Sequence, residues 1–139
     1  MTVPKWICPE CHRGFGRVRQ SHECSPAMTL DEYFSTGPER ERPIFEAVRD
    51  VLQAVGPIHV EPVSVGIFIK STRGFIELRP KTKWVALSFA LPREITHPKI
   101  ARKMRSSARV FHVVNLHTPD DLDDDVRDWI VESYLAATD

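Results

Sequence analysis

The residues with the clearest chemical potential lie together near the first residue of the chain. All three cysteines fall within the first 24 of the 139 residues. Cys8 and Cys11 are separated by two residues, a spacing that lets both thiolates bind one metal ion, and His22 and Cys24 follow. Three cysteines and one histidine make a closed tetrahedral zinc shell without a position for a reactive water. The pattern therefore predicts a structural zinc held by Cys8, Cys11, His22 and Cys24.

Two alternatives to this ligand set remain open. The thiols could lie unligated in an unstructured leader, or His12 could replace His22, although it directly follows Cys11 and is poorly placed for chelation. Phe15 stands four residues after Cys11, where zinc fingers with two cysteines and two histidines place a core aromatic residue. The gap of ten residues before His22 is shorter than in those fingers, so any helix here is short and offers few side chains to read bases.

The charge of the chain is zero but is distributed unevenly. Residues 66–109 carry eleven Lys and Arg against two acids, a net charge of +9, and residues 110–139 carry one against eight, a net charge of −7. Residues 1–25 have a net charge of +2 (four against two) and residues 26–65 of −4 (three against seven). A stretch at +9 attracts polyanions over the short range that salt screening allows. Alternatively, the basic strands simply pair with the acidic helices.

Much of the positive charge surrounds a predicted β-hairpin, formed by residues 66–71 and 75–79 around a turn. Alternation along the second strand places Phe75, Glu77 and Arg79 on one side, so a basic residue lies beside an aromatic ring, as in sites that bind a phosphate and stack a base. Alternatively, Phe75 belongs to the core and the arginines are solvated edge residues. The candidate polyanion-binding residues, including two from the leader, are Lys70, Arg73, Arg79, Lys81, Lys83, Arg17 and Arg19.

Apolar periodicity predicts a helix on either side of the strands. The face of the first helix consists of apolar residues three or four apart: Ile44, Val48, Leu52 and Val55. Thr36 and Glu39 have capping-box spacing before it, while Pro43 indicates either a kink or a start near residue 43. The last helix follows Thr118 as its cap and Pro119 at its first position. Its predicted buried stripe is Leu122, Val126, Trp129, Ile130 and Tyr134.

The strands and helices together predict an α+β fold. Strand patterns cover residues 58–62, 66–71, 75–79, 84–91 and 109–116, and residues 92–107 are expected to form a long loop or a short helix. We expect a mostly antiparallel sheet of four to five strands, with the N- and C-terminal helices packed on one face. We expect two domains: a zinc-finger-like module over residues 1–25, and an α+β domain over residues 26–139 that stays folded when the module is removed.

Several short motifs occur in an order that resembles a known family. They are FIELRPK at 75–81, LPR at 91–93, HPKI at 97–100, HVV at 112–114 and LDDDVRDW at 122–129. In this order they resemble the bacterial domain of unknown function 5655, over about residues 40–136. In one branch of that family a similar cysteine-rich leader precedes the domain, and relatives occur beside modules suggestive of DNA restriction. Many members have Lys-Thr before the central hairpin, where this chain has Val63, Ser64 and Val65, so a family site that used that lysine is altered here.

The sequence favours binding over catalysis. It has no cysteine outside the leader, no supported Ser-His-Asp motif and no Gly-rich phosphate loop. We therefore expect a small non-catalytic, zinc-stabilised protein that contacts DNA, RNA or another polyanion through the basic hairpin. The alternatives are an enzyme acting on a phosphorylated small molecule, with a pocket around His112 and Arg79, and a protein-interaction module with an acidic partner.

The sequence also predicts where the protein is found. No run approaches the roughly 18 apolar residues that cross a bilayer, so no membrane partner is expected. The N-terminus lacks the charged-then-apolar order of a signal peptide. An odd number of cysteines crowded into the leader argues against a disulfide framework. We therefore expect a cytoplasmic protein.

Overall fold

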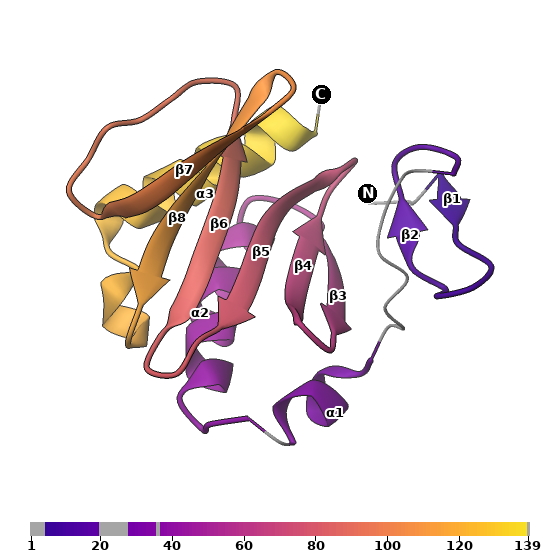
Figure 1. Ribbon diagram of the computed structural model, residues 1–139, viewed down its shortest axis with the longest axis horizontal. Coiled ribbons are helices and arrows are strands. Elements are labelled where there is room, and N and C mark those ends of the chain that lie inside the picture. Colours follow the sequence, from indigo (N-terminus) through magenta and orange to yellow (C-terminus); the bar gives the residue numbers. More distant parts are fainter. Residues whose placement is uncertain (1–4, 20–27, 36, 139) are drawn as a thin grey trace.

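The computed structural model describes residues 5–19, 28–35 and 37–138. Its elements are β1 (Trp6–Ile7), β2 (Gly14–Phe15), α1 (Leu30–Phe34), α2 (Glu41–Gln53), β3 (His59–Val63), β4 (Gly66–Lys70), β5 (Gly74–Pro80), β6 (Val85–Leu91), β7 (Ile100–Ser106), β8 (Arg109–Leu116), a 3-10 turn (Pro119–Asp121) and α3 (Asp124–Ala137). The main sheet has the antiparallel order β3-β4-β5-β6-β8-β7, and β1 pairs only with β2 (Figure 1). The α+β class predicted from the sequence is therefore confirmed.

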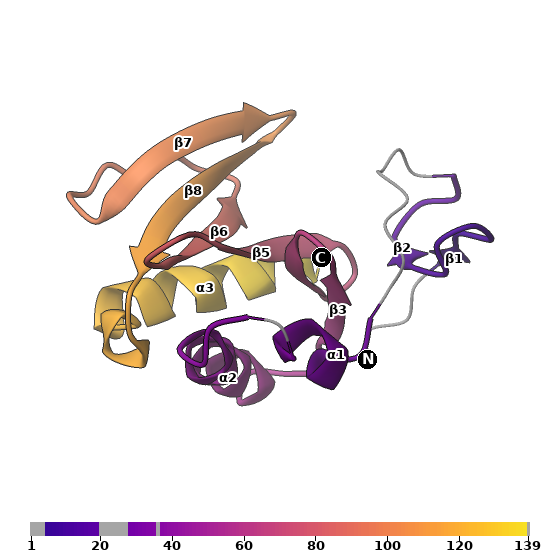
Figure 2. The ribbon, with the colours of Figure 1, turned by 60° about the horizontal axis from the view of Figure 1, so that its bottom comes forward.

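The molecule has a helix layer on one face of the sheet. Figure 2 shows α2 and α3 beneath the sheet, while β7 and β8 rise away from them and the small β1–β2 hairpin lies beside the β3 edge. The core between the layers contains most of the predicted faces of both helices and apolar residues of the strands, such as Ile69, Leu87 and Phe89. Val55 was wrongly assigned to the first face, because it lies beyond the end of α2 and is 38% exposed. Within the described part of the chain, no helix is long and apolar enough to cross a bilayer.

The starts of the helices follow local capping chemistry. The side chains and backbones of Thr29 and Glu32 form a complete capping box at α1. α2 begins only at Glu41 and its N-cap, Arg40, makes no side-chain capping bond, so the predicted capping box does not start this helix; Thr36 itself lies outside the described residues. Pro43 falls in the first turn, where its missing N–H costs no helical hydrogen bond. The alternative start near residue 43 is therefore the better prediction.

The C-terminal helix is split at its start. Thr118 and Asp121 form a capping box on the 3-10 turn, and the carboxylate of Asp123 then accepts a hydrogen bond from the Val126 N–H at the start of α3. The predicted buried stripe from Leu122 to Tyr134 is buried at all five positions. These apolar residues hold α3 against β5 and β6.

The prediction of four to five strands was wrong, because the main sheet has six. The additional strand is β7, in the segment that we expected to be a loop or short helix. Six of its seven residues are exposed, so it has no alternation of buried and exposed side chains. It pairs only with β8, at the edge of the sheet, where backbone hydrogen bonds rather than side-chain burial define the strand. The sequence of such an edge strand has little hydrophobic periodicity from which the strand could be predicted.

Candidate functional site

The predicted zinc module begins with a tight turn between β1 and β2. The Cys8 N–H donates to the Arg13 carbonyl oxygen at 2.9 Å, and the His12 N–H donates to the Cys8 carbonyl oxygen at 2.8 Å. Both Cys8 and Cys11 are buried, whereas His12 is exposed and has a left-handed backbone (φ 62°). The turn therefore brings the two cysteines of the Cys-x2-Cys motif into one small buried cluster.

The other two predicted ligands, His22 and Cys24, lie outside the described residues. Within the described ranges there is no group of three or more His, Cys, Asp or Glu side chains that could hold a metal. The structure thus leaves the four-ligand site as a prediction. Buried thiols at the two ends of one turn are nevertheless a suitable half of a Cys3His shell, because thiolates are soft ligands that zinc prefers.

The N-terminal hairpin, residues 5–19, is attached to the main sheet through one buried carboxylate. Glu61 of β3 accepts from Arg13 at 3.2 Å, from the Gly14 N–H at 2.8 Å and from His59 at 2.8 Å, and it pairs with Lys70 at 2.8 Å. Lys70 also donates to the Gly14 carbonyl oxygen at 2.7 Å. We call these five residues the Glu61 cluster. Its charged groups are buried apart from the half-exposed His59.

The electrostatics of this cluster keep Glu61 ionised. Burial alone would raise the pKa of Glu61, but hydrogen bonds from His59 and Lys70, the positive charge of Lys70 and the Gly14 N–H outweigh it and lower the pKa to about 2. Burial lowers the pKa of Lys70, against the opposing effect of Glu61. The charges therefore compensate one another inside the protein.

Close packing reinforces this attachment. The Lys70 ammonium lies 4.0 Å from the centre of the Phe15 ring, and the Arg13 guanidinium lies 4.7 Å from the centre of the Phe68 ring. A Cβ on Gly16 would stand 2.8 Å from the backbone oxygen of Thr72, closer than such atoms approach. The predicted module and the main domain are thus in contact through charge and packing. Whether residues 26–139 fold alone stays a prediction.

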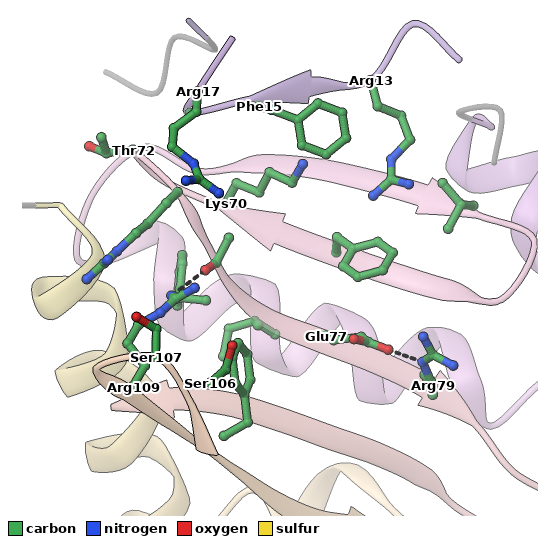
Figure 3. Close-up of a pocket in the computed structure, with 18 of the residues that line it drawn as sticks. Arg13, Phe15, Arg17, Lys70, Thr72, Glu77, Arg79, Ser106, Ser107 and Arg109 are labelled. Carbon is green, nitrogen blue, oxygen red and sulfur yellow. Dashed lines mark hydrogen bonds and ion pairs between the residues drawn. The ribbon is translucent and has the colours of Figure 1, made fainter. Parts of the chain in front are cut away.

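A pocket of about 780 Å³ lies between the N-terminal hairpin, the β4–β5 hairpin and the β7–β8 turn (Figure 3). Figure 3 shows Arg17 on the side of the N-terminal hairpin, with Ser106, Ser107 and Arg109 on the opposite side. Glu77 is the single acid among the residues that line it. We call it the basic pocket, because six of its lining residues are cationic: Arg13, Arg17, Lys70, Arg73, Arg79 and Arg109.

Three of these cations form a group that we call the rim arginines: Arg17, Arg73 and Arg109. Among the described residues, none of the three has an acidic partner. Arg109 donates to the Gly74 carbonyl oxygen at 2.8 Å, and its guanidinium lies 5.2 Å from the centre of the Phe111 ring. Burial and the nearby positive charge of Arg73 lower the pKa of Arg109. The rim therefore concentrates positive charge that the described residues do not neutralise.

The predicted polyanion-binding residues divide into three groups. Arg17 and Arg73 line the pocket without an acidic partner among the described residues, whereas Lys70 belongs to the Glu61 cluster and Arg79 pairs with Glu77. The remaining three are exposed and lie outside the pocket lining: Lys81, Lys83 and Arg19. The predicted hairpin thus contributes to the basic pocket, but only some of its positive side chains line the pocket without an acidic partner among the described residues.

The predicted position of Phe75 beside Glu77 and Arg79 was wrong. The register between β4 and β5 shifts at Ile69 and Lys70, so Phe75 has no partner residue in either neighbouring strand. It is 1% exposed, and its ring packs edge-on against Tyr134 of α3 at 5.6 Å. A bulge of this kind changes the face to which a side chain points, and alternation along one strand does not reveal it.

Glu61 and Arg109 were not identified from the sequence. Glu61 had a weak signal, because it is the one acid in a short apolar strand, where an ionised group requires partners. Arg109 follows a two-residue turn with a left-handed Ser107 (φ 59°). Its proximity to Arg73 arises only when β8 and the β4–β5 turn come together across the sheet.

Within residues 110–138, the acids that form ion pairs do so with residues outside the pocket. The Glu132 carboxylate accepts from Arg93 at 2.8 Å, and Asp123 pairs with Lys99; both cations belong to the segment between β6 and β7. α3 lies beneath the sheet in Figure 2, on the face away from the rising β7–β8 pair. Among the described residues, no acid of α3 pairs with a cation of the β4–β5 hairpin.

His112 does not complete a catalytic site in this pocket. It is fully buried, its Nε2 accepts from the Ile95 N–H at 2.9 Å, and its ring stacks on Phe89 at 5.2 Å. Burial lowers its pKa, which favours the neutral imidazole. The enzyme alternative requires a pocket around both His112 and Arg79. The basic pocket is lined by Arg79 but not by His112.

Comparison with known proteins identifies a family. Residues 30–137 match the family described as "Domain of unknown function (DUF5655)". This match covers well over half of the chain, from α1 to the end of α3. Neither the curated proteins nor the solved structures contain a match to the chain. The N-terminal hairpin lies outside the matched residues, although it supplies one side of the pocket.

Proposed function

We propose that this protein, which belongs to the DUF5655 family, is a small non-catalytic binding protein that holds nucleic acid or another polyanion in its basic pocket. The observation that carries the proposal is the group of rim arginines, which have no acidic partner among the described residues. Placing several positive charges around one hollow costs energy that bound phosphates would offset. The proposal needs no catalytic group.

The salt dependence of binding tests this proposal. Three or four phosphate contacts should give a slope of roughly −3 in a plot of log affinity against log salt for duplex DNA, because each contact releases counterions. Removing two contacts in the R17A/R73A variant should flatten that slope by roughly 2. Fluorescence anisotropy with labelled DNA and RNA measures both quantities.

The chain offers a matched control for this experiment. The K81A/K83A variant removes the same number of positive charges, from exposed positions outside the pocket. It should leave the slope nearly unchanged. Equal flattening in both variants would mean that net charge, and not the pocket, determines binding. Saturable binding of an acidic protein, without oligonucleotide binding, would instead favour the protein-interaction alternative.

A structural zinc in the N-terminal hairpin is the second part of the proposal. Burial of both Cys8 and Cys11 in one turn supports it, and the spacing of His22 and Cys24 supplies the other two ligands. The zinc would stabilise the hairpin that carries Arg17, without a chemical step of its own. Thiolate ligands also suit the reducing cytoplasm that we expected from the sequence.

Elemental analysis of the purified protein tests the zinc. We expect one zinc per chain, and a loss of that zinc in a C8S/C11S variant. Thiol titration in the native protein should be slow until a chelator is added. Less than about half an equivalent of zinc, together with readily titrated thiols, would contradict the predicted shell.

A further inference from the structure

The groups around the basic pocket are more varied than phosphate binding alone requires. Beside the rim arginines, the pocket presents the ring of Phe111 and the carboxylate of Glu77. Glu77 is paired with Arg79, so the rim arginines carry the positive charge that is offered to a phosphate. An aromatic ring contributes little to phosphate binding, but it stacks on any base. The mixture indicates a ligand with both an anionic and a planar part.

Arg109 and Phe111 form a preorganised stacking platform. The guanidinium lies 5.2 Å from the centre of the ring, and its hydrogen bond to the Gly74 carbonyl oxygen fixes it there at 2.8 Å. Both side chains line the pocket and are only partly buried. Unpaired bases stack on such guanidinium planes and rings, whereas the bases of a duplex are already stacked inside the helix.

The size and position of the pocket agree with this ligand. A volume of about 780 Å³ lies within the range of pockets that hold small molecules. Ser107, at the β7–β8 turn, has a left-handed backbone that glycine would adopt at lower cost, and this residue lines the pocket. Strained positions of this kind recur at ligand sites.

We infer that the basic pocket takes a nucleotide of a single-stranded nucleic acid, with its base on the Arg109–Phe111 platform and its phosphates on Arg17 and Arg73. This inference rests on the proposed function and specifies its ligand. A single strand can place a base inside the pocket while its backbone follows the rim. A duplex would have to unpair a base first, at an energetic cost.

Fluorescence anisotropy with three labelled probes tests the inference. The probes are an oligothymidylate about a dozen nucleotides long, an abasic strand of the same length and a duplex of equal phosphate number. At one salt concentration, the oligothymidylate should bind about tenfold more tightly than either of the others. An oligouridylate of the same length shows whether RNA and DNA are equally accepted.

Two variants separate stacking from charge. F111L should weaken oligothymidylate binding about fivefold or more and leave abasic binding unchanged. L135A alters an exposed residue of α3 and should change neither. Thermal melting identifies a variant that fails to fold. If F111L does not fold, the inference is tested on the native protein alone, by comparing its affinity for the abasic strand with its affinity for the oligothymidylate.

The outcomes distinguish this inference from the proposed function. Equal affinity for all three probes, with a normal salt dependence, would overturn the single-strand inference and leave polyanion binding intact. Tighter binding of the duplex would do the same. Absence of binding to every probe at low salt would overturn both proposals.

Discussion

Two groups of positive side chains lie within one region of the molecule, but the acids that the structure describes neutralise only one of them. In the Glu61 cluster, Arg13 and Lys70 share a buried carboxylate that keeps its negative charge. At the rim of the basic pocket, Arg17, Arg73 and Arg109 have no acidic partner among the described residues. Lysine and arginine therefore have two roles here, and the position of the nearest acid distinguishes them.

This difference predicts whether a substitution will change the stability of the protein or its binding of an anion. Buried charges depend strongly on their partners, so a change in the Glu61 cluster should appear as lost stability. The charges of the rim are partly solvated, so their removal should cost little stability and appear only when an anion is bound. The first group positions the N-terminal hairpin, and the second is available to a ligand.

The largest expected effect follows from removing the shared carboxylate. E61A leaves Arg13 and Lys70 buried without their counter-charge, and the free energy of unfolding should fall by about 3–5 kcal/mol. Urea denaturation measures it. The control E39A removes an exposed carboxylate and should change stability by about 0.5 kcal/mol or less. A loss below about 1 kcal/mol for E61A would mean that the cluster is not a stabilising unit.

The same cluster should give the stability of the protein an identifiable dependence on pH. Because the pKa of Glu61 falls from an ordinary value of 4.5 to about 2 on folding, its contribution is complete above about pH 4.5 and disappears as the pH falls towards 2. The difference in unfolding free energy between the native protein and E61Q should therefore shrink across this interval. Any loss of the proposed zinc at low pH should affect both proteins alike. Parallel pH profiles would contradict the prediction.

The comparison also explains how far the sequence could be interpreted. Most of the two predicted helix faces and the β4–β5 hairpin are local patterns, and they are confirmed. Lys70 looked like a ligand-binding cation because its acidic partner, Glu61, belongs to a different strand. Arg109 was overlooked because its approach to Arg73 depends on how distant strands meet. Which charges are paired is a tertiary property.

Two errors in the fold have the same origin. β7 has neither apolar alternation nor burial after Ile100, so only its ladder with β8 defines it as a strand. Phe75 faces α3 because of a bulge against β4, although alternation along β5 places it with Glu77. In both cases a neighbouring strand determines what the residues do, and the sequence of the segment alone contains no signal for it.

The smallest expected effect comes from a substitution that changes no charge. A Cβ at Gly16 would meet the backbone oxygen of Thr72 at 2.8 Å, so G16A must shift the N-terminal hairpin and with it Arg17. Affinity for the oligothymidylate should fall roughly two- to fivefold, as for a weakened charged hydrogen bond. V18A is the control, because Val18 is exposed on the same hairpin and does not line the pocket. If G16A binds as tightly as V18A, the docked position of the hairpin does not shape the pocket, and only Arg73 and Arg109 would remain as rim cations.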